Sequence, residues 1–89
     1  MLKQKYKINN ELIFETIGSQ MTIYDSEKSY VYTLDEISTQ IVNMIKKKQS
    51  IVKIVYKLTK IYEVEKERAN RDVKRLLKEL LQKKIIVVV

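Results

Sequence analysis

The side chains that most often do chemistry in proteins are sparse in this sequence. Its 89 residues include no cysteine and no histidine. This excludes zinc, iron–sulfur and haem sites of the usual kinds, and also thiol or histidine-based nucleophilic catalysis. The acidic residues are scattered without a paired arrangement, and a single glycine, Gly18, is too few for a phosphate-binding loop. We therefore expect no catalytic residue, no metal and no cofactor.

The remaining composition is typical of a small globular unit. Hydrophobic residues make up 45% of the chain, and no apolar stretch approaches the roughly 20 residues that span a bilayer. No apolar segment follows the charged N-terminus, as it would in a secretory signal. We expect residues 1–89 to form a single domain, located in the cytoplasm and without a membrane partner. The net charge of +7 is compatible with nucleic acid, an acidic peptide or simply a lysine-rich surface.

The first third of the chain has the alternating, β-branched pattern of strands. It predicts three strands, at residues 12–17, 21–25 and 29–33. The polar breaks between them, at 18–20 and 26–28, are so short that the strands must pair as antiparallel hairpins. Ile8 suggests the start of a further short strand, and the apolar run at residues 85–89 a terminal strand or extended tail.

After Leu34 the apolar residues recur at helical spacing, which predicts three helices. The first begins near Thr33 to Asp35: Thr33 has capping-box spacing to Glu36, and Asp35 is an alternative N-cap. Ser50 caps the second helix, and the third runs over about 65–83. The expected buried stripes are Ile37, Ile41, Val42 and Ile45; Ile51, Ile54, Val55, Leu58 and Ile61; and Ala69, Val73, Leu76, Leu77 and Leu80.

This order of elements predicts an α+β fold that is winged helix-turn-helix-like, with a three-stranded antiparallel sheet followed by three helices. The third strand is an edge, and small proteins normally block an edge with charge, proline or short length. Residues 29–33 carry no such block. Along them, Tyr30, Tyr32 and Leu34 point one way, and Val31 and Thr33 the other. The sequence does not decide which set faces the third helix.

These residues, taken in order, resemble the PqqD family. Residues 23–25, a polar turn, residues 30–33 and then Leu34-Asp35 are similar to the family's two strands leading into a helix. Residues 41–45, 50–55 and 72–80 are similar to its later helical motifs, the last of them to "DVxxFLxxL". The resemblance runs from about Ile8 to Val87. It departs from the family where Asp35 replaces Asn, where Val42 replaces Trp, and at Lys47 and Lys84, where glycine is frequent.

The resemblance implies a non-catalytic module that captures the leader segment of a ribosomally synthesised precursor peptide. The leader would add as a strand beside the third strand, in a groove walled by the third helix. The implied partners are the precursor leader peptide and a cognate leader peptidase or radical SAM enzyme, with lasso-peptide biosynthesis a typical setting. We expect the leader-peptide-binding surface to comprise Tyr30, Val31, Tyr32, Thr33, Asp72, Arg75, Leu76 and Glu79.

Helical geometry supports this choice on the third helix, and a simpler interpretation stays open. Asp72, Arg75 and Glu79 share one flank of its apolar stripe, and Leu76 could floor a pocket. The same side chains could instead be a solvated face with local ion pairs, Asp72 with Arg75 and Arg75 with Glu79. The tyrosines of the third strand could likewise pack in the core.

Two other functions compete with peptide capture. A winged-helix DNA-binding protein would use the third helix, whose Lys and Arg residues are, however, interrupted by Glu and Asp. The predicted strands also precede the helices, whereas the usual wing follows them. The second alternative is a structural or dimerisation subunit, in which the open edge or the 85–89 tail pairs with another copy of the chain. We expect the chain to be a monomer or a weak homodimer.

Overall fold

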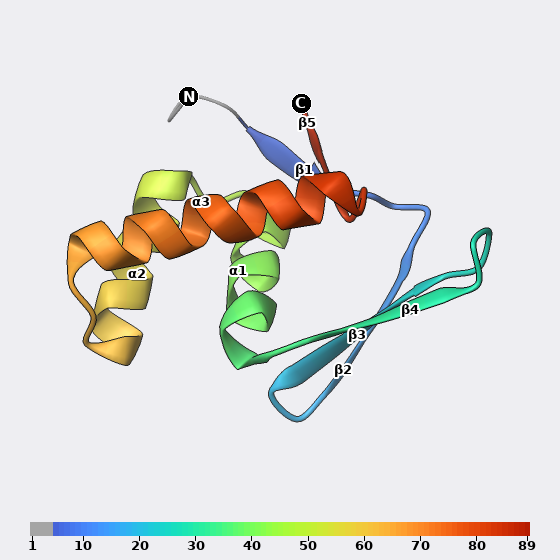
Figure 1. Ribbon diagram of the computed structural model, residues 1–89, viewed down its shortest axis with the longest axis horizontal. Helices are drawn as coiled ribbons and strands as arrows, with labels where there is room; N and C mark the ends of the chain where they lie inside the picture. The colour runs from blue at the N-terminus through green and yellow to red at the C-terminus, as the bar shows by residue number, and fades with distance from the viewer. Residues whose placement is uncertain (1–4) are drawn as a thin grey trace.

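The computed structural model describes residues 5–89, and its elements follow the expected order, with a short strand near each end of the described chain (Figure 1). The strands are β1 (Tyr6–Ile8), β2 (Ile13–Ile17), β3 (Gln20–Asp25), β4 (Tyr30–Leu34) and β5 (Ile86–Val88). The helices are α1 (Glu36–Lys46), α2 (Ile51–Tyr62) and α3 (Lys66–Gln82). β2, β3 and β4 form an antiparallel sheet in that order, so the predicted α+β class is confirmed. No helix in residues 5–89 is long and apolar enough to cross a membrane.

The first hairpin turns more tightly than expected. Ile17 pairs with Gln20, so Gln20 belongs to β3 and the predicted three-residue break at 18–20 was too long. The two turn residues that remain are Gly18 and Ser19. Gly18 has φ +63°, a left-handed conformation that costs glycine little because it has no Cβ.

The second hairpin has a polar turn that fixes where β4 begins. The Asp25 carboxylate accepts hydrogen bonds from the backbone N–H groups of Glu27 and Lys28, at 3.1 and 3.2 Å. Ser29 has φ +55°, which a strand residue does not adopt. The strand therefore starts at Tyr30, one residue later than predicted.

Helix N-caps are set by local hydrogen bonds. Asp35 is the N-cap of α1, with its carboxylate accepting the N–H of Ser38 at 2.8 Å. The capping-box alternative at Thr33 was wrong, because Thr33 stays in β4 opposite Thr22. Ser50 caps α2 as predicted, accepting the N–H of Lys53 at 3.2 Å.

A second, two-stranded sheet joins the two ends of the described chain. β1 and β5 pair antiparallel, and Ile8 lies opposite Ile86. Ile8 is thus the end of a strand, not its start, because Asn9 makes the turn: its side chain accepts the N–H of Glu11 and donates to the carbonyl of Lys84. The apolar C-terminal run is a strand, one of the two possibilities that the sequence left open.

The hydrophobic core lies between the helices and one face of the three-stranded sheet. Its buried members are Met21, Ile23, Leu34, Ile41, Val42, Met44, Ile45, Ile51, Ile54, Val55, Leu58, Ala69, Val73, Leu77, Leu80, Ile85 and Ile86. Three stripe predictions were wrong: Ile37 and Ile61 are 44% and 52% exposed, and Leu76 is only half-buried. Ile37 and Ile61 lie in terminal turns of their helices, where fewer neighbouring elements cover the surface. That one domain spans 1–89 stays a prediction.

Candidate functional site

One edge of β4 has no strand partner among residues 5–89. β3 occupies the other edge. The apolar C-terminal strand, which could have covered the open edge, pairs with β1 instead. Figure 1 shows β1 and β5 together, away from the edge of β4. The main-chain groups along this edge are therefore available to a further strand.

The buried hydroxyl of Thr39, in α1, shows which way the β4 main chain points. It accepts the N–H of Met21 at 3.0 Å and donates to the carbonyl of Leu34 at 3.4 Å. Met21 and Leu34 are register partners, and because one hydroxyl bonds both the N–H of Met21 and the C=O of Leu34, these groups point toward each other between β3 and β4. Because this direction alternates along a strand, the N–H and C=O groups of Val31 and Thr33 point to the open edge.

The register also decides which face of β4 its side chains occupy. Tyr32 lies opposite Ile23, which is fully buried on the helix-facing side of the sheet. Tyr30, Tyr32 and Leu34 therefore lie on this inner face. Val31 and Thr33 lie on the outer face, and both are exposed. The burial of Ile23 thus shows which of the two sets of β4 side chains faces the helices.

The inner-face side chains form a gradient from core to solvent. Leu34 is buried, Tyr32 is half-buried and Tyr30 is 58% exposed. The two tyrosine rings stack, with centroids 5.9 Å apart and an interplanar angle of 23°. An apolar platform with polar hydroxyl tips thus lies beside the open edge, as is common at interfaces.

The C-terminal end of α3 meets this platform. The Nζ atom of Lys83 lies 5.3 Å from the centroid of the Tyr32 ring, a cation–π contact. At about 100° per residue, Asp72, Leu76 and Glu79 lie within about 40° of Lys83 around the helix, and Arg75 within about 80°. The predicted flank is therefore on the side of α3 that reaches β4.

The members of this flank differ in their distance from β4. At about 1.5 Å per residue, Glu79 lies about 6 Å along the helix from Lys83, Leu76 about 10 Å and Asp72 about 16 Å. Glu79 is exposed, whereas Leu76 is half-buried and packs against the core. Along the helix, Glu79 and Leu76 are therefore nearer to the contact with β4 than Asp72 is.

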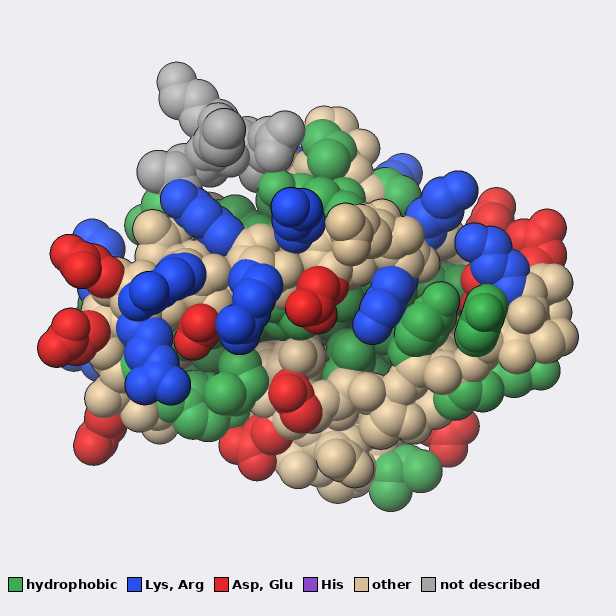
Figure 2. All heavy atoms as spheres, in the orientation of Figure 1, with side chains coloured by type: hydrophobic (Ala, Val, Ile, Leu, Met, Phe, Trp, Pro, Cys, Tyr) green, Lys and Arg blue, Asp and Glu red, His purple; other side chains and the backbone are tan. Residues whose placement is uncertain are grey.

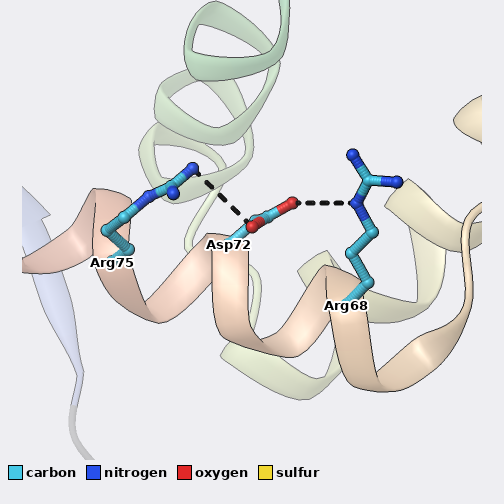
Figure 3. A network of polar contacts seen from close by, with 3 residues as sticks. All are labelled: Arg68, Asp72 and Arg75. Carbon is cyan, nitrogen blue, oxygen red and sulfur yellow. Dashed lines mark ion pairs between the residues drawn. The ribbon is translucent and has the colours of Figure 1, made fainter.

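Asp72 is the centre of a small charged network (Figure 3). Its carboxylate lies 3.6 Å from the guanidinium of Arg75 and 3.8 Å from that of Arg68. The predicted Asp72–Arg75 pair is confirmed. No ion pair joins Arg75 to Glu79 within the described residues, so that local pair was wrong: Arg75 reaches Asp72 instead. Glu79 is left exposed.

The exposed face of α3 carries both signs of charge. Figure 2 shows Lys and Arg side chains interleaved with Asp and Glu along the helix, above hydrophobic side chains on the sheet side. No group of three or more Asp and Glu side chains in residues 5–89 is arranged to hold a metal ion.

The start of α1 and the end of α2 meet next to the end of β4. The hydroxyl of Tyr62 donates a hydrogen bond to the Glu36 carboxylate at 3.1 Å. Partial burial raises the pKa of the Tyr62 phenol, and the Glu36 carboxylate raises it further. This bond ties the last residue of α2 to the first residue of α1, directly after the strand.

The family model of coenzyme PQQ synthesis protein D matches residues 20–86. The chain belongs to the PqqD family. No curated protein sequence matches it. The PqqD match starts at the first residue of β3 and so includes the whole of β4 and α3.

Two solved structures have the same fold. One is described as TbiB1 in complex with the TbiA(beta) leader peptide; it is 19% identical and has a TM-score of 0.84, with 90% of this chain and 93% of that chain covered. The other is a lasso peptide synthetase B1 complexed with the leader peptide, 22% identical with a TM-score of 0.86, covering 93% and 98%. At these identities the likeness shows the fold alone.

Two residues that lie at this site, Lys83 and Thr39, were not predicted from the sequence. Lys83 could have been found by continuing the α3 flank by one turn beyond Glu79. Thr39 carries no sequence signal beyond a polar residue on an apolar helix face. Its role depends on a contact between α1 and the β3–β4 pair, which sequence spacing does not reveal.

Proposed function

We propose that this chain is a non-catalytic module that captures the leader segment of a ribosomally synthesised precursor peptide and delivers it to a modifying or processing enzyme. The observation that carries the proposal is the open edge of β4, which lies beside an aromatic platform and the flank of α3. Membership of the PqqD family and a fold shared with two leader-peptide complexes support it.

Capture proceeds by strand addition. The leader pairs with the outward main-chain groups of Val31 and Thr33, which hold any extended peptide whatever its side chains. Alternate leader side chains turn inward and lie against Tyr30, Tyr32 and Leu76, which supply selectivity for apolar or aromatic anchors. An added strand with two such anchors reaches micromolar affinity, about −8 kcal/mol, which suits a carrier that must release its cargo.

The charged flank of α3 reads the part of the leader that extends beyond β4. Asp72 and Glu79 attract basic leader side chains, and Arg75 attracts an acidic one. Because Asp72 already pairs with Arg68 and Arg75, a leader lysine or arginine at this point must compete with a local pair. We expect these contacts to tune partner choice more than affinity.

The receiving partner is a cognate leader peptidase or radical SAM enzyme. Delivery needs no chemistry from this chain, in keeping with its lack of cysteine and histidine. We propose a single domain over residues 1–89 that acts in the cytoplasm as a monomer or weak homodimer, without cofactor, metal or membrane partner.

The DNA-binding alternative has no specific observation in its favour. In α3, Arg68 and Arg75 share the carboxylate of Asp72, and further acidic side chains interleave with the basic ones. Acidic groups on a recognition helix would repel the phosphate backbone. We therefore do not propose nucleic acid as a partner.

A fluorescence-anisotropy titration tests the proposal, with the labelled leader of the short precursor encoded beside this chain's gene. The matched variants are Leu76→Ala and Leu81→Ala. Both leucines are half-buried on α3 and pack against the core, but only Leu76 lies on the flank toward β4. Leu76→Ala is expected to weaken leader binding about tenfold, and Leu81→Ala less than about twofold, at similar loss of stability.

Equal effects of the two leucine variants on leader binding would remove α3 from the site. If the unaltered protein does not bind the leader at all, the proposed function is wrong.

A further inference from the structure

One part of the molecule that leader capture does not use carries lysines and no acidic residue. Residues 37–62, which cover most of α1 and all of α2, contain no Asp or Glu. Their six lysines are Lys46, Lys47, Lys48, Lys53, Lys57 and Lys60. On α3, by contrast, the two signs of charge interleave. Positive charge without nearby negative charge is therefore concentrated on α1 and α2, where an anionic partner would be attracted.

The fold brings two lysines of this segment and two lysines from the start of the described chain around one cavity. The cavity, of about 730 Å³, lies between β1 and the turn that joins α1 to α2. Lys5 and Lys7 line it from β1 and the residue before it, and Lys46 and Lys48 from the opposite side. All four are exposed, and no acidic side chain among residues 5–89 lines the cavity.

The interior of the cavity is apolar. Ile8, Ile45 and Ile51 line it, and apolar surface makes up the larger part of its wall. Its size is within the range of about 300–1,000 Å³ that ligand pockets show. The cavity thus combines room for an apolar side chain with a rim of like charges.

Two further groups favour an anionic peptide as occupant. Ser50 and Ile51 belong to the N-terminus of α2, whose first turn has no acidic residue to offset its partial positive charge. The side-chain oxygen of Gln49 is buried and accepts no hydrogen bond from residues 5–89. After a rotation of its amide, that oxygen could accept a peptide N–H, which relieves an unsatisfied polar group.

We propose that this cavity binds an acidic peptide segment of a second protein, with one apolar side chain inserted between Ile45 and Ile51 and carboxylates held by the surrounding lysines. The concave shape of the cavity favours a peptide over a lipid surface or a nucleic-acid duplex. A lipid surface needs apolar side chains that protrude, and a duplex needs cations along a convex or flat track. A cavity takes a protruding side chain. The site shares no lining residue with β4 or α3, so it is separate from leader capture.

The test is a fluorescence-anisotropy titration with a short labelled peptide that carries a central leucine between aspartate and glutamate residues. The charge-reversal variant is Lys7→Glu with Lys48→Glu, two exposed residues of the rim. Its matched control is Lys53→Glu with Lys60→Glu, which changes net charge equally on exposed positions of α2 outside the cavity. The rim variant is expected to weaken binding about tenfold or more and the control about twofold.

A second arm leaves the protein unchanged, in case the rim variant folds poorly. Replacing the central leucine of the peptide with serine is expected to weaken binding about fivefold, because the apolar contact is lost. Equal loss in the rim and control variants, or equal binding of the serine peptide, overturns the proposal. The proposal is also overturned if a labelled random duplex, or vesicles with anionic lipid, bind more tightly than the acidic peptide and the rim variant abolishes that binding. Retained leader binding by the rim variant is expected, since leader capture uses another surface.

Discussion

The edge of β4 and the lysine-lined cavity offer two different kinds of recognition on one small chain. At β4 the binding groups are main-chain N–H and C=O, with stacked tyrosines beside them and acidic and basic side chains that already neutralise one another on α3. At the cavity, four lysines surround an apolar interior, and no acidic side chain of residues 5–89 lines it. The first surface holds an extended chain of varied sequence, whereas the second selects by charge.

The largest expected effect is that of Val31→Pro on leader binding. The N–H of Val31 points to the open edge, so proline removes a donor that the guest strand needs and adds a ring where its backbone would lie. We expect a loss of about thirtyfold or more, about 2 kcal/mol. Binding of the acidic peptide to the cavity should be unchanged. Anisotropy titrations with both peptides measure this.

Tyr32→Pro is the matched control for that variant. The N–H of Tyr32 points toward β3, so proline there removes a bond inside the sheet and lowers the thermal unfolding temperature, whereas Val31→Pro leaves it nearly unchanged. Should the two variants lose stability equally while leader binding persists in Val31→Pro, the assignment of the open-edge groups is wrong.

The two surfaces should differ in their response to salt. Raising the salt concentration from about 50 to 500 mM shortens the screening length from about 14 to about 4 Å. We expect the acidic peptide to lose about tenfold in affinity for the cavity, and the leader to lose less than about threefold at β4. The two titrations are made side by side in the same buffers. A steeper salt dependence for the leader than for the acidic peptide would contradict the division of roles.

Tyr30→Ala separates aromatic surface from main-chain pairing. Tyr30 is more than half exposed, so its loss costs the fold little, but it removes the outer half of the stacked pair with Tyr32. We expect leader affinity to fall about fivefold, by about 1 kcal/mol. Circular dichroism should show an unchanged fold. Unchanged affinity would place Tyr30 outside the leader's path.

The smallest effect concerns the hydrogen bond between Tyr62 and Glu36. The pKa of the phenol is raised in the folded state, so the stabilisation is fully present below the ordinary tyrosine pKa near 10 and is lost as pH rises through the raised value. Tyr62→Phe should therefore lower the unfolding temperature by about 3 °C at pH 8. The difference between the two proteins should shrink toward pH 11. A constant difference would indicate packing alone.

The local pattern of the chain was sufficient to predict the three-stranded sheet, the three helices and the cap at Ser50. These depend on neighbours within a few residues along the sequence. The choice between Thr33 and Asp35 as N-cap was not decidable locally, since it depends on how far β4 pairs with β3. The inner face of Tyr32 likewise depends on the burial of its partner Ile23.

What could not be predicted are the contacts between distant segments. The pairing of Tyr6 with Val88 joins residues at opposite ends of the sequence, and no pattern within either short strand indicates which strand it pairs with. The contact of Lys83 with Tyr32 and the grouping of Lys7 with Lys46 have the same origin. Helical steps showed which α3 residues share a flank, but only the packing of the chain brings Lys83, on the same side, to Tyr32.

The pairing of β1 with β5 has a topological consequence. The backbone N–H of Val89 donates to the carbonyl of Lys5 at 2.9 Å, and Figure 1 shows β1 and β5 side by side, so Lys5 and Val89 lie together at the two ends of the described chain. A few glycines could therefore bridge them, and the ring could be reopened in the Ser26–Ser29 turn. Such a circular permutant would keep every strand pair while turning β4 into the first strand of the chain, with its edge still open.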